Sequence, residues 1–203
     1  RLLTEVESKE LLLEAGIPTT SALLATSREE ATRLSRQIGF PAVLKIASTT
    51  IVHKSDAGGV RLGLSSEDEV GLAYDEMMAA IKKGNPDADI QGVSVQPMAR
   101  PGIELVMGMS KDQQFGPVLM FGLGGVLVEV LGDVAFRIVP LTPRDAAQMI
   151  REVKGFPILG GYRGQEPVDI AALEESLLKL SRFVDDRPMI KEMDLNPVFA
   201  YSD

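Results

Sequence analysis

The run FGPVLMFGLGGVLVE, residues 115–129, decides the fold class and is the most unusual stretch of this chain. Four glycines bracket apolar, strand-like segments within it. Glycine in a strand costs backbone entropy, so the pattern indicates turns or the close approach of a ligand to the backbone. Glu129 alternates with its valine neighbours and therefore faces away from them. Taken alone, Glu129 fits a solvated strand face, and we also consider it a candidate catalytic carboxylate.

The glycine-rich run lies within a series of strand-like runs separated by short turns, which is typical of an antiparallel sheet. These runs are 93–98, 103–109, 116–121, 126–131 and 135–139; two helices at about 143–153 and 170–184 and a last strand at 189–199 follow. The first part of the chain predicts helices at 6–15, between Ser27 and Gly39 and between Ser66 and Gly84, with strands at 21–25, 42–46 and 60–64. Breaker residues at 82–89 predict two α+β subdomains, 1–87 and 88–203.

Composition excludes several classes of function. The chain has 203 residues with 21 Lys and Arg against 29 Asp and Glu, and its net charge of −8 disfavours nucleic acid and anionic membranes as partners. Cysteine is absent, which excludes disulfides, thiolate nucleophiles and cysteine-based zinc sites. With a single histidine, any bound metal must have oxygen ligands, which favours Mg²⁺.

The sequence also bears on location. It has no apolar run of the roughly 18 residues that a membrane-spanning helix needs, and its first residues lack the order of a signal peptide. We therefore expect a cytoplasmic protein. The missing initiator methionine and the end just after an apolar run suggest a segment of a longer chain, or its ordered part.

Lys45 interrupts the buried run Ala42–Ile46. An unpaired ammonium buried there would cost several kcal/mol, so Lys45 needs an anionic partner. Two interpretations remain open: a lysine that reaches solvent from an edge strand, and a clamp for phosphate.

The segment HKSDAGGV, residues 53–60, combines the only histidine with a Gly58-Gly59 turn. Glycines let backbone N–H groups approach phosphate oxygens closely, and Lys54 adds positive charge. A Gly-Gly pair is most often just a turn, however, and a lone histidine is usually a surface residue.

Three oxygen-bearing side chains, Glu192, Asp194 and Asn196, follow one another at every second position of the last strand. This spacing places them on one face, where they could share Mg²⁺ with substrate phosphates. Such acidic faces are usually solvated, but the apolar flanking residues favour a cleft.

Together, Lys45, the Gly58-Gly59 loop, run 115–129 and DLNP at 194–197 resemble an ATP-grasp domain in order and spacing. Within that superfamily, essentially the whole chain is most similar to the nucleotide-binding β part of ADP-forming acyl-CoA synthetases. This group, the ADP-forming acetate–CoA ligases, is related to succinyl-CoA synthetase. The resemblance implies an acid–thiol ligase with ATP/ADP and Mg²⁺, and an α+β ATP-grasp fold that binds the nucleotide between its two subdomains.

The resemblance also assigns roles to residues. It implies that the nucleotide is bound by Lys45, Gly58, Gly59, Gln96, Met98 and Glu104, with Lys45 on the phosphates and the segment 96–98 beside the adenine. The resemblance further implies that Asn196 and Asp194 are metal ligands, and that Asp194 and Glu129 are catalytic residues. It also implies that His53 is a phosphohistidine that relays phosphate to a histidine of the CoA-binding (α) part. Neutral imidazole is a competent nucleophile near pH 7, which suits this role.

Two family features are missing from the sequence: the second metal-binding aspartate, which would lie beyond Asp203, and the CoA-binding Rossmann-like domain. The reaction therefore requires a CoA-binding α subunit or domain, in a hetero-oligomer or a fused chain. The alternatives are an ATP-grasp domain that senses a ligand within a fused protein acyltransferase, and a structural subunit that has lost catalysis.

Overall fold

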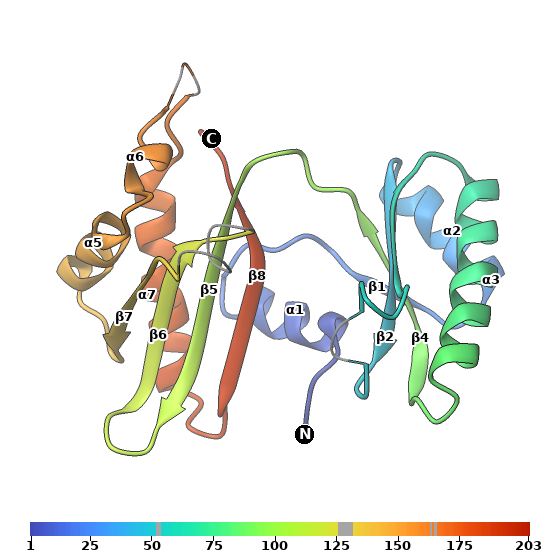
Figure 1. Cartoon of the computed structure of the whole chain (residues 1–203), viewed down its shortest axis with the longest axis horizontal. Helices are drawn as coiled ribbons and strands as arrows, with labels where there is room; N and C mark the ends of the chain where they lie inside the picture. The colour runs from blue at the N-terminus through green and yellow to red at the C-terminus, as the bar shows by residue number, and fades with distance from the viewer. Residues whose placement is uncertain (52–53, 126–131, 163, 165) are drawn as a thin grey trace. The chain divides into compact units, whose positions relative to one another are not determined.

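The computed structural model describes residues 1–203 except 52–53, 126–131, 163 and 165. The chain forms two compact units, Arg1–Ala99 and Arg100–Asp203, and the described residues of each contain a four-stranded antiparallel sheet with helices. Figure 1 shows the course of the chain. The α+β class is confirmed. The predicted division at 87/88 lies too early, because strand β4 (Ile90–Pro97) pairs with strands of the first unit.

The first unit has the strand order β1-β4-β2-β3. Its other elements are α1 (Glu5–Glu14), β1 (Leu23–Ala25), α2 (Arg28–Ile38), β2 (Ala42–Ser48), β3 (Val60–Leu64) and α3 (Glu67–Gly84). The helices predicted after Ser27 and Ser66 are confirmed, and both serines cap them: each hydroxyl accepts from the backbone N–H three residues on. The Glu30 carboxylate accepts from Thr26 rather than from Ser27, so a reciprocal capping box at Ser27 is only half formed.

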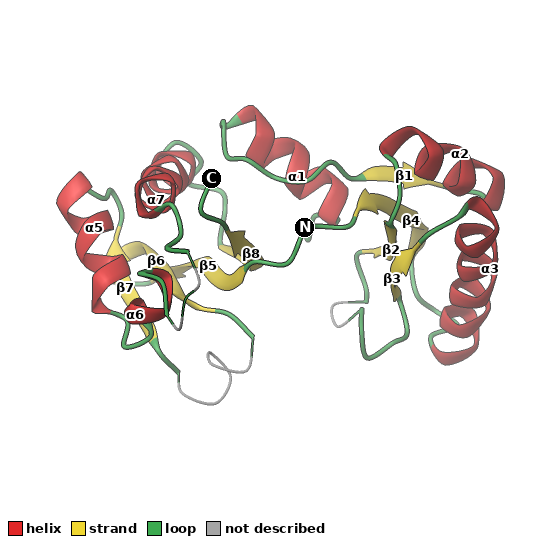
Figure 2. Cartoon of the chain, turned by 90° about the horizontal axis from the view of Figure 1, so that it is seen from above, coloured by secondary structure: helices red, strands yellow, loops and turns green. Residues whose placement is uncertain are grey.

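The two faces of the first sheet differ in chemistry because side chains alternate along β2 and β4. Leu44 and Ile46 of β2, with Val93 and Val95 of β4, pack into the hydrophobic core that α2 and α3 complete. Figure 2 shows these two helices together beside the sheet. The intervening residues, Lys45, Ser94 and Gln96, face the other way. Lys45 lies directly opposite Ser94 in the β2–β4 ladder, so polar side chains gather on that face.

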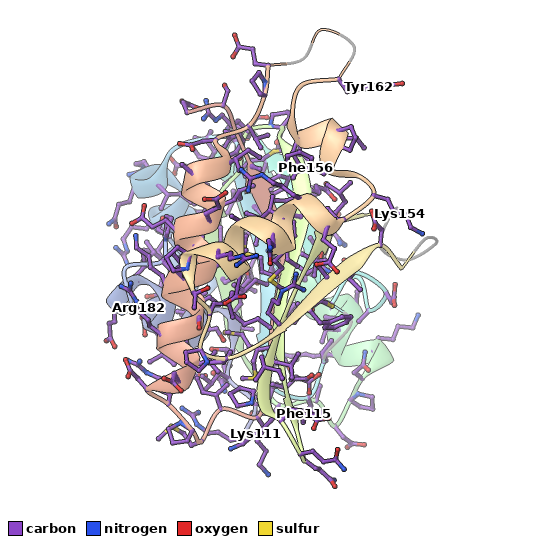
Figure 3. All side chains as sticks on the ribbon, turned by 90° about the vertical axis from the view of Figure 1, so that its left-hand side faces the viewer. Lys111, Phe115, Lys154, Phe156, Tyr162 and Arg182 are labelled. Carbon is purple, nitrogen blue, oxygen red and sulfur yellow. The ribbon has the colours of Figure 1, made fainter. Side chains whose placement is uncertain are left out.

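The second unit has the strand order β7-β6-β5-β8. Its elements are β5 (Ile103–Asp112), β6 (Gly116–Leu123), β7 (Val134–Ile138), α5 (Pro143–Glu152), α6 (Phe156–Leu159), α7 (Ile170–Asp185) and β8 (Glu192–Ala200). Four predicted strands and both predicted helices are confirmed. The run 93–98 belongs instead to the first sheet, and 126–131 lies outside the described residues. Figure 3 shows Lys111 and Phe115 at the β5–β6 turn.

The glycine-rich run has a structural explanation within the chain. Gly116 closes the β5–β6 turn with a φ of +75°, a conformation that side chains with a Cβ rarely adopt. A Cβ at Gly124 would lie 3.0 Å from the backbone carbonyl carbon of Glu104. The turn that the glycines predicted is therefore present, and the backbone of the neighbouring strand β5 lies close to Gly124. Among the described residues, no helix is both long and apolar enough to span a membrane.

Candidate functional site

Lys45 belongs to a central strand, because β2 pairs with β3 on one side and β4 on the other. The interpretation as a lysine on an edge strand is therefore wrong. The anionic partner that the sequence required is Glu5 of α1, whose Oε1 lies 2.9 Å from Lys45 Nζ. The Lys45 side chain is 28% exposed and that of Glu5 is 20% exposed, so the ion pair is largely shielded from water.

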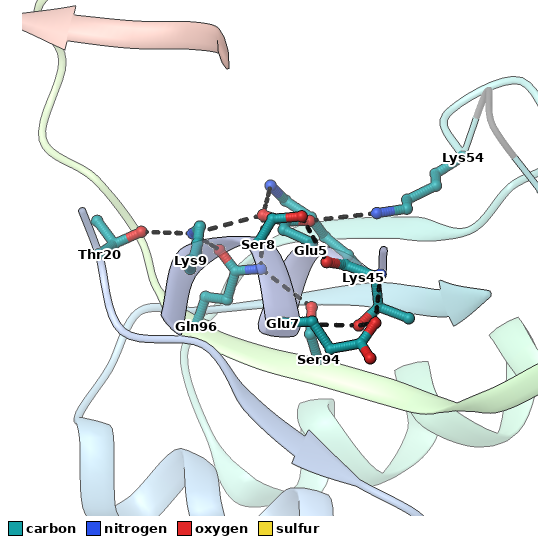
Figure 4. Close-up of polar contacts among 10 residues, drawn as sticks. Glu5, Glu7, Ser8, Lys9, Thr20, Lys45, Lys54, Ser94 and Gln96 are labelled. Atoms are coloured by element: carbon teal, nitrogen blue, oxygen red, sulfur yellow. Dashed lines mark hydrogen bonds and ion pairs between the residues drawn. The ribbon is translucent and has the colours of Figure 1, made fainter. Parts of the chain in front are cut away.

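Glu5 joins four other side chains, Lys9, Lys45, Lys54 and Gln96, into what we call the Glu5 cluster. Its Oε1 accepts hydrogen bonds from Lys45 and from Gln96 Nε2, both at 2.9 Å, and lies 3.4 Å from Lys9 Nζ. Its Oε2 accepts from Lys54 Nζ at 3.3 Å. Figure 4 shows that α1, β2, β4 and the loop after β2 all contribute to this arrangement.

The charges of the cluster change the titration of its members. Burial by itself would raise the pKa of Glu5, but Lys45, the hydrogen bond from Gln96 and the charge of Lys9 together lower it from 4.5 to about 2. Burial lowers the pKa of Lys9, although the attraction of Glu5 opposes this. Glu5 is thus fully ionised at neutral pH, as a buried partner of lysines should be.

Local sequence explains how Glu5 is positioned. Thr4 and Glu7 form a capping box that fixes the start of α1, which places Glu5 in the first turn. Lys9 follows one turn later on the same side of the helix. Glu5 and Lys9 were not predicted as site residues; the capping box and the Glu-Lys spacing were the available signals in the sequence, but neither reveals the contact with β2.

The loop that carries Lys54 closes on itself through its glycines. Gly58 N–H donates to the Ser55 carbonyl at 3.0 Å, and Gly59 N–H donates to the Lys54 carbonyl at 2.7 Å. A Cβ at Gly59 would lie 2.5 Å from Cγ2 of Ile46, so glycine is required there. Both N–H groups are already bonded, and phosphate binding by Gly58 and Gly59 stays a prediction. His53 lies outside the described residues.

Gln96 and Met98 differ in their surroundings. The Gln96 side chain is buried. Its Nε2 donates to Glu5 and Ser94, and its Oε1 accepts from Lys9. This places Gln96 within the Glu5 cluster, so its predicted position beside an adenine stays a prediction. Met98 is exposed, and its N–H donates to the Pro41 carbonyl at 3.0 Å.

The second unit carries the predicted metal ligands on β8. Asp194 lies opposite Gly108 in the β5–β8 ladder, whereas the register shifts between Leu195 and Val198. Exposed and less exposed positions still alternate from Glu192 through Asp194 to Asn196, so the shared face of Asp194 and Asn196 stays a prediction. Partial burial, together with the negative charge of Glu192, raises the pKa of Asp194.

The described residues include no cluster of three His, Cys, Asp or Glu side chains that could hold a metal. One carboxylate and one amide oxygen, from Asp194 and Asn196, still fit Mg²⁺, which keeps several waters and binds substrate phosphates as further ligands. Glu104 is exposed on β5, and its carbonyl accepts a hydrogen bond from Gly124 N–H at 2.7 Å. Glu129 lies outside the described residues.

Comparison with known proteins gives a consistent result. A model of the ATP-grasp domain family matches residues 1–203. Subunit beta of the ADP-forming acetate–CoA ligase I of Pyrococcus furiosus is 47% identical over 203 residues, which are 100% of this chain and 88% of that subunit.

Two structures of acetyl-coenzyme A synthetase 1 from Candidatus Korarchaeum cryptofilum also match. The complex with coenzyme A, Ca-AMPCP and HgCl+ has a TM-score of 0.96 and 51% identity, covering 100% of this chain and 88% of that one. The complex with coenzyme A and Mg-AMPPCP, whose phosphohistidine segment points towards the nucleotide-binding site, has a TM-score of 0.85 and 48% identity, covering 99% and 86%. The match over the whole chain, in sequence and in structure, shows that this chain belongs to the ATP-grasp family.

Proposed function

We propose that this chain is the ATP-binding, phosphoryl-transferring part of an ADP-forming acyl-CoA ligase, which interconverts acid, CoA and ATP with acyl-CoA, ADP and phosphate. The observation that carries the proposal is Lys45, a partly buried lysine on a central strand beside a second lysine. The names of the relatives, and the nucleotide analogues and coenzyme A in the Korarchaeum complexes, support the same activity.

In this proposal Lys45 binds the terminal phosphates of ATP. Asp194 and Asn196 would hold Mg²⁺, which neutralises the charge of the phosphates during transfer. The γ-phosphoryl group passes to an imidazole nitrogen of His53: the bond from phosphorus to the β,γ-bridging oxygen breaks, a P–N bond forms, and ADP leaves with the electron pair. The imidazole ring becomes positively charged as the P–N bond forms, and loss of the proton on its other nitrogen to water restores neutrality.

The partner in this reaction is a CoA-binding α subunit or domain. The Pyrococcus relative is named a subunit beta, which supports a two-subunit enzyme. We propose that phosphate moves from His53 to a histidine of that partner. We also propose that the two predicted domains, 1–87 and 88–203, act as the two ATP-grasp subdomains, with their boundary moved to Ala99. A ligand-sensing domain fused to a protein acyltransferase is not favoured, because the relatives compared above are ligases.

Calorimetric titration of this chain with Mg-ATP tests the proposal. We expect saturable binding by the wild-type chain, and at least a tenfold loss in Lys45→Ala, which is more than about 1.4 kcal/mol. Lys83→Ala, which removes an exposed lysine of α3, is the matched control and should bind normally. Failure of the wild type to bind Mg-ATP contradicts the proposal.

The relay needs the complete enzyme. With a CoA-binding α partner present, His53→Ala should abolish formation of acyl-CoA while leaving the affinity for Mg-ATP nearly unchanged. Full turnover in that variant would exclude the relay through His53.

A further inference from the structure

Three lysines surround one carboxylate in the Glu5 cluster, so the cluster carries two more positive than negative charges. Fractional exposures of 15% for Lys9, 28% for Lys45 and 22% for Lys54 show that water only partly reaches these side chains. Lysines this close to one another repel, and Coulomb energies grow as water is excluded. The arrangement is therefore suited to an additional anion.

The three lysines differ in how many donors they have left. An ammonium group has three N–H donors. Lys9 Nζ uses its donors on Thr20 Oγ1 at 2.7 Å, Gln96 Oε1 at 2.6 Å and the Glu5 carboxylate at 3.4 Å. In the described part of the chain, the ammonium groups of Lys45 and Lys54 donate hydrogen bonds only to Glu5, which leaves each of them two donors.

The Glu5 carboxylate bridges Lys45 and Lys54. Lys45 is on β2, while Lys54 is on the loop that follows it, and the two oxygens of one carboxylate bind one lysine each. Gln96 and Lys9 also contact Oε1 of this carboxylate, which helps to fix its orientation. The lysines are thereby presented as a pair, with their ammonium groups on neighbouring oxygens.

We propose that Glu5 is a positioning residue that holds Lys45 and Lys54 together as a two-lysine site for the polyphosphate of a nucleotide. The inference deepens the proposed function and rests on it for the identity of the nucleotide. It adds Lys54, which is next to His53 in sequence, as a second phosphate-binding residue, and it gives Glu5 a role without contact to the substrate. Lys9 and Gln96 keep Glu5 in place.

Removal of the Glu5 charge distinguishes positioning from simple competition. If Glu5 merely occupied the place of phosphate, Glu5→Gln would make the cluster more positive and tighten anion binding. If Glu5 positions the lysines, the same variant binds a polyphosphate more weakly in spite of the added positive charge. The sign of the change therefore decides between the two roles.

The experiment is calorimetric titration of the full chain with Mg-ATP, with AMP and with inorganic tripolyphosphate. We expect Glu5→Gln and Lys54→Gln each to lower the affinity for Mg-ATP and tripolyphosphate about tenfold, or about 1.4 kcal/mol, and to leave the affinity for AMP within about twofold. Glu10→Gln is the matched control, because it removes an exposed carboxylate from the same helix, and it should bind all three ligands normally. Circular dichroism verifies that each variant is folded.

The double variant adds a readout that mere loss of structure would not give. If Glu5 acts through Lys54, Glu5→Gln should cost less affinity in the Lys54→Gln background than alone. Unchanged or tighter tripolyphosphate binding in Glu5→Gln overturns the inference, as does an equal loss for AMP and Mg-ATP. Wild-type binding of tripolyphosphate without binding of Mg-ATP would refute the proposed function and leave the two-lysine site standing; binding of neither would refute both.

Discussion

Neutralising Glu5 should make the first unit less stable by an amount that depends on pH. Glu5 has a pKa of about 2 in the folded chain, against 4.5 ordinarily, because Lys45 and its neighbours stabilise the carboxylate. A carboxyl group with a lowered pKa in the folded state contributes stability above its unfolded pKa, and this contribution is lost as the pH falls towards the folded pKa. The relevant window therefore runs from about pH 4.5 down to about pH 2.

The size of the effect follows from the two pKa values. A difference of one unit is worth about 1.4 kcal/mol, so the lowered pKa contributes about 3.4 kcal/mol at pH 6. At pH 3 the unfolded carboxyl is mostly protonated and the folded one is still mostly ionised, which leaves about 1.4 kcal/mol. The stability difference between the wild type and Glu5→Gln should thus shrink by about 2 kcal/mol between pH 6 and pH 3.

Urea unfolding followed by NMR signals of β2 and β4 amides measures this difference for the first unit alone. Glu10→Gln, on the exposed side of α1, controls for the general effect of acid. The stability difference between the wild type and this variant should not change between pH 6 and pH 3. A stability difference that stays constant from pH 6 to pH 3 would show that Lys45 does not hold Glu5 in its ionised form. An NMR titration of the Glu5 carboxyl carbon gives the pKa directly.

Three further changes test the packing and the second unit. Leu44→Ala, at a fully buried core position, should cost about 2–5 kcal/mol in urea unfolding, whereas Leu62→Ala on the exposed side of β3 should cost under about 0.5 kcal/mol; similar values would place Leu44 outside the core. Gly59→Ala should destabilise the first unit, because its Cβ would lie 2.5 Å from Cγ2 of Ile46, and it should cost less in an Ile46→Ala background, which lacks Cγ2, if the contact is responsible. Asp194→Asn should raise the thermal midpoint of the second unit at pH 7, because the pKa of Asp194 is raised by partial burial and by Glu192, and the gain should disappear near pH 3; a lower midpoint at pH 7 would contradict this.

Much of the fold could be predicted from the sequence because it depends on local patterns. Ser27 and Ser66 mark the starts of α2 and α3, and the run Ala42–Ile46 reads as a buried strand. The pairing of strands could not be predicted, because it is decided by contacts distant in sequence. Strand β4 therefore appeared to belong to the second half, although it lies between β1 and β2.

The same limit applies to the site. Lys45 could be singled out from sequence, because a charge within an apolar strand has to be compensated. The compensating Glu5 is 40 residues away, and Gln96 is 91 residues from Glu5. The sequence around Lys45 shows only that this lysine needs an anionic partner. The sheet register and the packing of α1 determine that the partner is Glu5.

The position of Glu5 also resolves how a chain with a net charge of −8 can present a site for polyphosphate. The overall field of the protein repels anions, so attraction has to come from a local excess of positive charge that is shielded from solvent. A lone lysine on β2 would not suffice, because the burial of an unpaired ammonium group is costly. A carboxylate placed between the lysines holds them close together, and Lys9 offsets its negative charge. The cost of burying Lys45 and Lys54 as ammonium groups is thus reduced by Glu5 before any phosphate arrives.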